Sequence, residues 1–186
     1  HLCTDTWKYD MSEWHISWQS KYSKENQEIS INNDLGRHRA DVLINNTVIE
    51  FQHSPISPEE FAERNEFYLA CGYRVIWLFD ATNEYQTKLN KYGVDYYRWK
   101  YPPKMLTGFN VYGQVQVFFH LIDSKQQEGG EIVRLIDCVN GDLSKFETAP
   151  SEHYTENEFV ELTSTGRVDR EKDISGKDKL YHTLYK

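Results

Sequence analysis

The sequence predicts an α/β domain with a mixed sheet, in which the order helix, strand, strand, strand, helix, strand is followed by a C-terminal antiparallel β addition. Three observations predict it: helical spacing of apolar residues near the N-terminus, two β-rich runs flanking Asn45-Asn46, and a capped helix before an apolar run at 74–80. Such a run is typical of a strand buried on both faces. We expect a core at 1–105, a β-rich extension of the same domain at 106–141 and a polar C-terminal segment at 142–186.

The first two elements precede the β-rich runs. Asp10 and Glu13 have the spacing of a capping box, and aromatic and apolar side chains recur on one helical face, which predicts a helix over 11–22. The alternation in 27–32 predicts a strand that ends in a turn at Gly36.

The two β-rich runs predict a hairpin, because Asn readily adopts the left-handed backbone that a two-residue turn at Asn45-Asn46 needs. With this turn, Asp41 lies directly opposite Glu50, and Arg39 lies opposite Gln52. Directly opposed residues have β carbons about 4.5–5.5 Å apart. The alternate positions are apolar and face the core. The hairpin therefore presents two neighbouring carboxylates.

The later elements follow from caps, helix breakers and apolar runs. Ser57, Pro58 and Glu60 form a strong helix start, and Gly72 ends that helix before the apolar run. Beyond it we expect a short helix, two antiparallel strands and a second capped helix, at 83–92, at 114–122 with 132–139, and at about 156–163.

Composition narrows the function classes. The net charge of −8 argues against a basic coat that holds nucleic acid by charge alone, but not against a local basic strip or a carboxylate cluster neutralised by a metal. Three widely spaced cysteines indicate free thiols in a reducing cytoplasm. No apolar run is long enough for a transmembrane helix, and no signal peptide is recognisable. Because the sequence begins at His1, we expect a fragment or a processed chain.

Paired carboxylates on an otherwise apolar hairpin are destabilising, and protonation of one acid, a bound cation or salt bridges could relieve the repulsion. Two oxygen ligands at this separation suit a hard divalent ion, Mg²⁺ or Mn²⁺, which can polarise a phosphate oxygen and lower the pKa of a bound water. The alternative is a solvated strand face in which Asp41 and Glu50 form salt bridges with nearby Arg or Lys side chains.

The spacing of Asp41 and Glu50-Phe51-Gln52 resembles the signature of the PD-(D/E)XK nuclease superfamily, whose restriction-endonuclease-like core has the element order expected above. The sequence also resembles competence protein CoiA-like nucleases over about residues 11–105. The motifs that carry this resemblance lie at 13–18, 38–42, 49–56, 63–68, 72–77 and 99–100.

The resemblance implies a divalent-metal-dependent DNA nuclease. Asp41 and Glu50 would be metal ligands and catalytic, and Gln52 would position water or phosphate. Gln52 stands where the superfamily usually has Lys, and a neutral amide can only donate or accept hydrogen bonds. Charge stabilisation is then left to the metal or to nearby basic groups.

Further site residues are candidates on position alone. Glu13 is the candidate acid of the first helix; His15 is its competitor, because about 200° separates them on a helical wheel. Glu28 and Ser54 are additional candidates. The candidate nucleic-acid contacts are basic side chains or histidines near the predicted site: Arg39, His53, Arg64 and Lys100.

The expected partner is DNA, with RNA not excluded, no membrane, and a homodimer left open. The expected role is phosphodiester hydrolysis in DNA uptake, recombination or repair. The alternative is a catalytically degenerate module of the same fold that binds nucleic acid or another protein.

Overall fold

The computed structural model describes residues 11–81, 85–91, 94–99, 114–121, 130–134, 137–138, 145–148 and 153–165. The chain divides into two compact units. The first comprises His1–Asp80 with Lys104–Phe118, and the second comprises Ala81–Pro103 with Phe119–Lys186. The predicted boundaries after residues 105 and 141 remain predictions.

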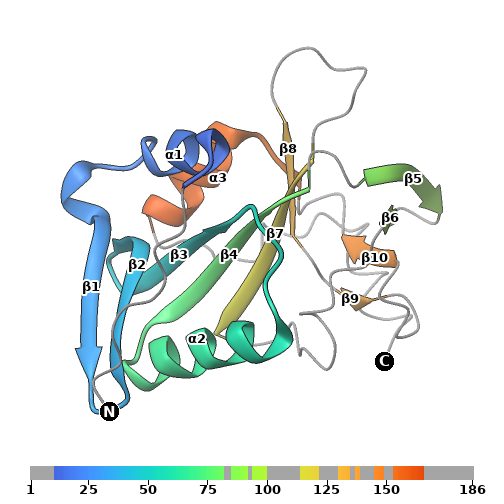
Figure 1. The fold of residues 1–186 in the computed structure, drawn as a ribbon. Coiled ribbons are helices and arrows are strands. Elements are labelled where there is room, and N and C mark those ends of the chain that lie inside the picture. Colours follow the sequence, from blue (N-terminus) through green and yellow to red (C-terminus); the bar gives the residue numbers. More distant parts are fainter. Residues whose placement is uncertain are drawn as a thin grey trace. The chain divides into compact units, whose positions relative to one another are not determined.

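The first unit has the expected element order (Figure 1). Its elements are α1 (Glu13–Gln19), the 3-10 turn η1 (Lys24–Asn26), β1 (Gln27–Asn33), β2 (Gly36–Ile44), β3 (Thr47–Gln52), α2 (Pro58–Ala70) and β4 (Arg74–Asp80). The strands lie in the order β1-β2-β3-β4, and the beginning of β7 (Val115–Leu121) follows β4. β1, β2 and β3 pair antiparallel, whereas β4 is parallel to β3 through the α2 crossover. The sheet is therefore mixed, as expected.

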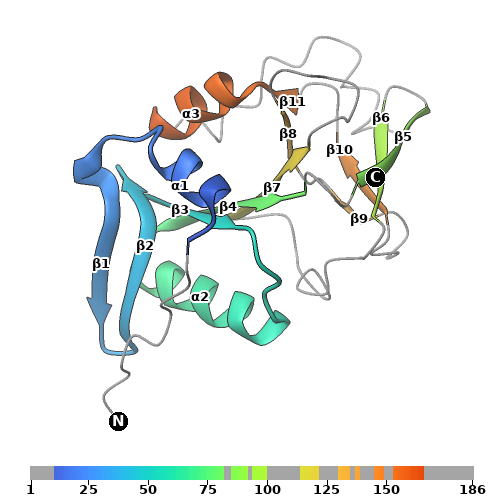
Figure 2. The ribbon, with the colours of Figure 1, turned by 45° about the horizontal axis from the view of Figure 1, so that its top comes forward.

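The two helices of this unit cover opposite faces of its sheet (Figure 2). On the α1 face, Phe51 packs against the rings of Trp14, Trp18 and Tyr22, at centroid distances of 6.4, 6.2 and 6.0 Å. Glu50, the preceding residue of β3, contacts α2 instead. Since successive strand residues alternate between faces, β3 directs one aromatic ring and one carboxylate to opposite sides.

α1 begins later and ends earlier than the sequence predicts. Its N-cap is Ser12, whose hydroxyl accepts the His15 N–H at 3.2 Å, so the capping box expected at Asp10 is not the start of the helix. A serine one residue before the first helical position satisfies an N–H that would otherwise lack a partner. α1 therefore covers Glu13–Gln19 rather than the expected 11–22.

α2 begins as predicted. The Ser57 hydroxyl accepts the Glu60 N–H at 3.1 Å, and Pro58 occupies the first turn. The Glu60 carboxylate does not complete a capping box, because it binds Arg64 one turn later at 3.0 Å. Gly72, with φ of +80°, follows the end of the helix.

The described residues of the second unit form antiparallel pairs and the helix α3. Its elements are the remainder of β7, β8 (Glu131–Arg134), β11 (His153–Tyr154) and α3 (Glu156–Ser164), with a four-stranded sheet of β5 (Tyr85–Lys91), β6 (Val94–Trp99), β10 (Lys145–Thr148) and β9 (Asp137–Cys138). All pairs recorded among β5, β6, β9 and β10 and between β8 and β11 are antiparallel. The Thr155–Glu158 capping box starts α3, as expected.

The short helix expected at 83–92 is wrong, because this segment contains strand β5. β5 pairs with β6 from Tyr85 opposite Trp99 to Lys91 opposite Val94. A helix of about ten residues is marginal without an apolar face to bury, whereas the hairpin satisfies the backbone of both segments. Within the described part of the chain, every helix is too short or too polar to cross a bilayer.

Candidate active site

A cavity of about 90 Å³ lies in the first unit, on the β2–β3 hairpin. Space of this size admits a few water molecules or a hydrated ion. Its lining comes from the start of α1, from β1, β2 and β3, from the loop after β3 and from α2. The described lining residues are Met11, Ser12, His15, Glu28, His38, Arg39, Asp41, Phe51, Gln52, His53, Ser54, Arg64 and Tyr68.

Asp41 lines this cavity and is held by the backbone of the neighbouring strand. Its Oδ2 accepts the Phe51 N–H at 2.8 Å, and its backbone carbonyl accepts the Gln19 side-chain amide at 3.1 Å. Its Oδ1 lies 3.3 Å from His15 Nε2. These contacts fix the carboxylate while its side chain keeps 16% of its surface exposed.

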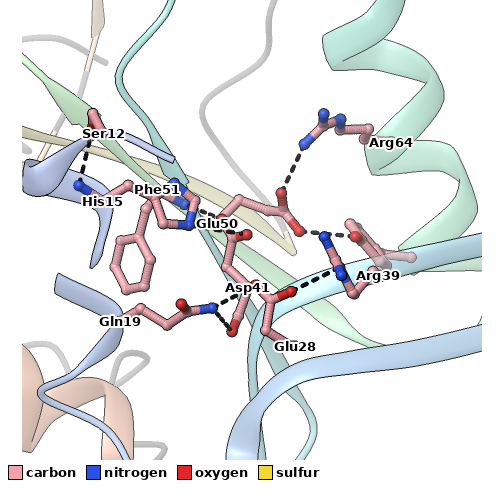
Figure 3. Close-up of polar contacts among 10 residues, drawn as sticks. Ser12, His15, Gln19, Glu28, Arg39, Asp41, Glu50, Phe51 and Arg64 are labelled. Carbon is pink, nitrogen blue, oxygen red and sulfur yellow. Dashed lines mark hydrogen bonds and ion pairs between the residues drawn. The ribbon is translucent and has the colours of Figure 1, made fainter. Parts of the chain in front are cut away.

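Asp41 and two neighbouring side chains form a group of three potential metal ligands. One atom from each of His15, Glu28 and Asp41 lies within 4.8 Å of the other two, and we name these residues the open cluster (Figure 3). Glu28 is held from two sides, because Gln19 donates to its Oε1 at 2.7 Å and the Arg39 guanidinium lies 2.8 Å from its Oε2. The cluster thus draws on α1, β1 and β2.

The environment of His15 favours its protonated form in the absence of an ion. Burial lowers the pKa of His15, but the contact with Asp41 and the charges of Asp41, Glu50 and Glu28 outweigh burial and raise it above its ordinary value. The Nε2 atom is buried without a hydrogen bond of acceptable geometry. A cation beside these carboxylates, whether a proton or a metal ion, is therefore favoured.

Glu28 occupies its position at a conformational cost. Its φ is +54°, in the left-handed region that L-residues rarely adopt. The pairing of β1 with β2 skips this residue, passing from Gln27 opposite Val42 to Ile29 opposite Ala40. Strained backbone of this kind is typical of functional positions.

Glu50 has different surroundings on the α2 side. Arg64 donates from Nη1 to its Oε2 at 2.9 Å, and the Tyr68 hydroxyl donates to its Oε1 at 2.8 Å. Glu50 is 1% exposed. We name Glu50, Arg64 and Tyr68 the closed cluster. Arg64 also binds Glu60, which holds its guanidinium in place.

Burial dominates the ionisation of the closed cluster. It raises the pKa of Glu50 to about 7; the negative charge of Asp41 acts in the same direction, and Arg64 and Tyr68 oppose it. Burial and the adjacent carboxylate also raise the pKa of Tyr68 far above its ordinary value, so Tyr68 remains a hydrogen-bond donor. Glu50 is therefore sensitive to pH in the neutral range.

The hairpin register is confirmed up to the two acids. Ile44 pairs with Thr47, Leu43 with Val48, and Val42 with Ile49, around a turn in which Asn45 has φ of +53°. The recorded pairs end there and do not extend to the expected pairs Asp41–Glu50 and Arg39–Gln52. Asp41 instead accepts the Phe51 N–H through its side chain. The charge of Asp41 nevertheless raises the pKa of Glu50, so the two acids interact electrostatically.

The end of β3 contributes three of the predicted residues to the lining. The Gln52 amide donates to the Ser54 carbonyl at 2.5 Å. His53 Nδ1 lies 2.6 Å from Oδ2 of Asp80, at the end of β4. Gln52, His53 and Ser54 all line the cavity.

The structure brings His15 rather than Glu13 to the cavity. Glu13 is exposed and is not among the lining residues, while His15 from the same helix contacts Asp41. Arg39 and Arg64 also line the cavity. Lys100 lies outside the described residues. The structure adds four residues that were not among the predicted site residues: Gln19, His38, Tyr68 and Asp80.

Three of these additions had a signal in the sequence. Gln19 follows His15 by four residues, which places both on one face of a helix. Tyr68 follows Arg64 by the same interval on α2. His38 lies in one of the motifs, and its ring packs 4.3 Å from that of Phe67. Asp80 could be found only from the register between β3 and β4.

The donor set of the open cluster fits a divalent cation. Two carboxylates and one imidazole suit Mn²⁺ well, and Mg²⁺ also binds through carboxylates and water. Glu50 does not belong to this set of mutually close ligand atoms, and each of its oxygens already accepts a hydrogen bond. The sequence predicts Asp41 and Glu50 as metal ligands. Of these two, Asp41 is the one whose carboxylate lies close to other potential ligand atoms.

Comparison with known families gives one match. The family model for the nuclease-like domain of competence protein CoiA matches residues 6–126, well over half of the 186 residues. Searches of curated proteins and of solved structures give no match. The family expected from the motifs is confirmed. The matched range contains the whole described cavity and both clusters, and the chain belongs to the family of CoiA nuclease-like domains.

Proposed function

We propose that this domain is a nuclease that hydrolyses DNA phosphodiester bonds with Mg²⁺ or Mn²⁺. The observation that carries the proposal is the open cluster, which gathers one imidazole and two carboxylates within 4.8 Å in a cavity of a nuclease-like domain. The order of elements and the mixed sheet of the first unit support a restriction-endonuclease-like core.

Asp41 would be the central metal ligand, with His15 and Glu28 beside it. When bound, the ion would polarise a phosphate oxygen and acidify a coordinated water. Glu50 would act from the α2 side, where its charge contributes to the negative potential at the cavity. Its expected role as a direct ligand would require a second lone pair on an oxygen that already accepts a hydrogen bond.

Basic and amide side chains of the cavity would bind the phosphate backbone. Arg39 is 45% exposed and could exchange its contact with Glu28 for a phosphate oxygen. Gln52 could orient water or phosphate by hydrogen bonding, but it cannot neutralise charge. Because the whole chain carries a net charge of −8, binding would depend on local contacts rather than on an overall positive field.

The direct test measures cleavage of double-stranded DNA, single-stranded DNA and RNA by the purified chain in Mg²⁺, Mn²⁺ or EDTA. We expect divalent-dependent cleavage of DNA. Asp41→Asn keeps the size of the side chain and removes the charge, so it should lower cleavage by at least about 10²-fold, more than the loss of a residue that only supports a ligand. Glu59→Gln is the matched control, because Glu59 is exposed outside the cavity.

Calorimetry with Mn²⁺ separates metal binding from turnover. The wild-type chain should bind Mn²⁺, and Asp41→Asn and Glu28→Gln should bind it more weakly. Cleavage by Asp41→Asn at the wild-type rate would contradict the proposed site. Absence of both cleavage and Mn²⁺ binding in the wild-type chain would contradict the proposed function.

The second candidate is a nucleic-acid-binding module without turnover. The observation that favours it is the state of Glu50 and Gln52: the first is buried in a salt bridge, and the second has its amide committed to Ser54. Salt-sensitive DNA binding without cleavage in any divalent ion would support this function. Roles in DNA uptake, recombination or repair, and a homodimer, stay proposals under either candidate.

A further inference from the structure

A histidine and an aspartate meet where β3 and β4 end. The parallel pairing of these strands runs from Thr47 opposite Arg74 to Gln52 opposite Phe79. One step further, the same register brings His53 beside Asp80. The two side chains make the contact that this register predicts, with Nδ1 2.6 Å from Oδ2.

This contact fixes the chemistry of the imidazole. The Asp80 side chain is 7% exposed, and an ionised carboxylate can only accept a hydrogen bond, so Nδ1 of His53 carries the hydrogen. In neutral His53, Nε2 is then the atom with a free lone pair. Trp14 packs beside the imidazole at a ring-centroid distance of 6.2 Å, which restricts its rotation.

The His53 side chain is 48% exposed and lines the same cavity as the open cluster. Two other histidines are among the described lining residues. His15 has Nε2 directed at Asp41 within that cluster, and His38 is buried against Phe67. His53 therefore combines solvent access with an oriented ring.

We propose that His53 is the general base of the reaction and that Asp80 is its positioning residue. This inference rests on the proposed nuclease function. The motif itself provides no general base at position 52, because Gln52 has no lone pair basic enough to take a proton from water. His53 would supply that base.

In the proposed step, the oxygen of a water molecule forms a bond to phosphorus as Nε2 of His53 takes one proton of that water. The ester bond between phosphorus and the leaving oxygen breaks, and its electron pair stays on that oxygen. The leaving oxygen takes a proton from solvent, and His53 later returns its proton to solvent. Asp80 stabilises the imidazolium that forms in between.

The test compares kcat and KM for DNA cleavage in Mn²⁺ among the wild type, His53→Gln, His53→Ala and Asp80→Asn. Loss of a general base lowers kcat by about 10²–10⁴-fold. We expect this loss in both His53 variants, with KM little changed, and partial recovery of His53→Ala by added imidazole. His153→Gln is the matched control, because His153 pairs with Glu131 outside the cavity lining.

Nuclear magnetic resonance of ¹⁵N-labelled imidazoles gives a readout independent of turnover. The wild-type chain should show His53 with hydrogen on Nδ1. Asp80→Asn should increase the form with hydrogen on Nε2, because an amide can donate to Nδ1, and kcat should fall with it. Thermal unfolding of each variant reports whether the fold is retained.

Each outcome decides the proposal. A wild-type chain that cleaves, with His53→Gln at the wild-type kcat, would overturn the base role and leave the nuclease function intact. A change in KM alone would assign His53 to phosphate binding and also overturn it. A wild-type chain without cleavage in any divalent ion would overturn the proposed function, and the base role with it.

Discussion

The open and closed clusters place two carboxylates of one hairpin in contrasting surroundings. Asp41 is partly exposed and faces another carboxylate and an imidazole, with no Arg or Lys side chain recorded against it in the described residues. Glu50 is buried, and a guanidinium and a hydroxyl occupy its two oxygens. The difference indicates that the elements packed against each strand, α1 or α2, determine what each acid can do. Pairs of acids with divergent environments commonly divide their chemical roles.

Removing the cation of the closed cluster should have the largest effect on stability. Arg64→Met keeps much of the buried volume but leaves Glu50 without its compensating charge. Breaking a buried ion pair from one side costs about 3–5 kcal/mol. We expect a loss of this size in the free energy of unfolding at pH 8, measured by urea denaturation, and a smaller loss at pH 5, where Glu50 is protonated.

The control for Arg64→Met removes its other partner. Glu60 is more exposed than Glu50, and Glu60→Gln should cost no more than about 1 kcal/mol. Adding Glu50→Gln to Arg64→Met should restore part of the lost stability, because the buried charge is gone. Equal losses from Arg64→Met and Glu60→Gln would show that the closed cluster is not a tightly coupled pair.

The raised pKa of Glu50 predicts a pH dependence opposite to that of an ordinary salt-bridged acid. Between pH 4.5, the ordinary pKa of a glutamate, and pH about 7, the folded chain keeps a proton on Glu50 that the unfolded chain releases. Folding is therefore favoured at the acid end of this range. The contribution of Glu50 to the free energy of unfolding falls by about 3 kcal/mol as the pH rises through the range.

The measurement is the difference in free energy of unfolding between the wild type and Glu50→Gln in EDTA, from pH 4.5 to 8. This difference should fall as the pH rises. In an Asp41→Asn background the fall should be smaller, because the charge of Asp41 contributes to the raised pKa of Glu50. A difference that is constant with pH would mean that Glu50 is ionised throughout the range.

The turn of the hairpin and the N-caps of α2 and α3 were predictable from the sequence because their determinants are local. Asn45 sets the turn, and Ser57 with Pro58 sets the start of α2. The asymmetry of the two acids was not predictable, because Arg64 reaches Glu50 from a separate helix. The partnership of His53 and Asp80 needed the register of a parallel pair, which no short-range pattern encodes.

Other errors came from competition between local signals. The capping-box spacing of Asp10 and Glu13 predicted the start of the first helix, but Ser12 is its N-cap, and His15 rather than Glu13 lines the cavity. The segment 83–92 has a composition that suits a helix, but pairing with β6 made it a strand. The contribution of Glu28 depended on a positive φ, which is a property of the folded strand and not of glutamate.

Mn²⁺ should stabilise the chain through the open cluster alone. A ligand at 100 times its dissociation constant stabilises the state that binds it by about 2.7 kcal/mol. We expect Mn²⁺ to raise the wild-type unfolding temperature and EDTA to reverse the change. Asp41→Asn should abolish the shift, and Glu59→Gln should retain it. An undiminished shift in Asp41→Asn would place the ion elsewhere.

The smallest expected effect on stability comes from the strained backbone of Glu28, a residue of the open cluster. Glu28 and Asn45 are the non-glycine residues with positive φ in the described part of the chain, and only Glu28 belongs to a cluster. Both Glu28→Gly and Glu28→Ala remove the carboxylate, so their difference isolates the backbone. The left-handed conformation costs an L-residue roughly 1–2 kcal/mol, and Gly avoids that cost. Glu28→Gly should therefore be more stable than Glu28→Ala by about 1 kcal/mol.

The same pair of substitutions at Ser30, two residues along β1 and without positive φ, should have the opposite sign, because Gly is unfavourable in an ordinary strand. Both Glu28 variants should bind Mn²⁺ equally weakly in calorimetry, since both lack the carboxylate. If Glu28→Gly gains stability and loses metal binding, the wild-type chain maintains a strained ligand at some cost in stability. If Gly and Ala rank at position 28 as they do at position 30, the positive φ of Glu28 carries no cost in stability, and the open cluster is held without backbone strain.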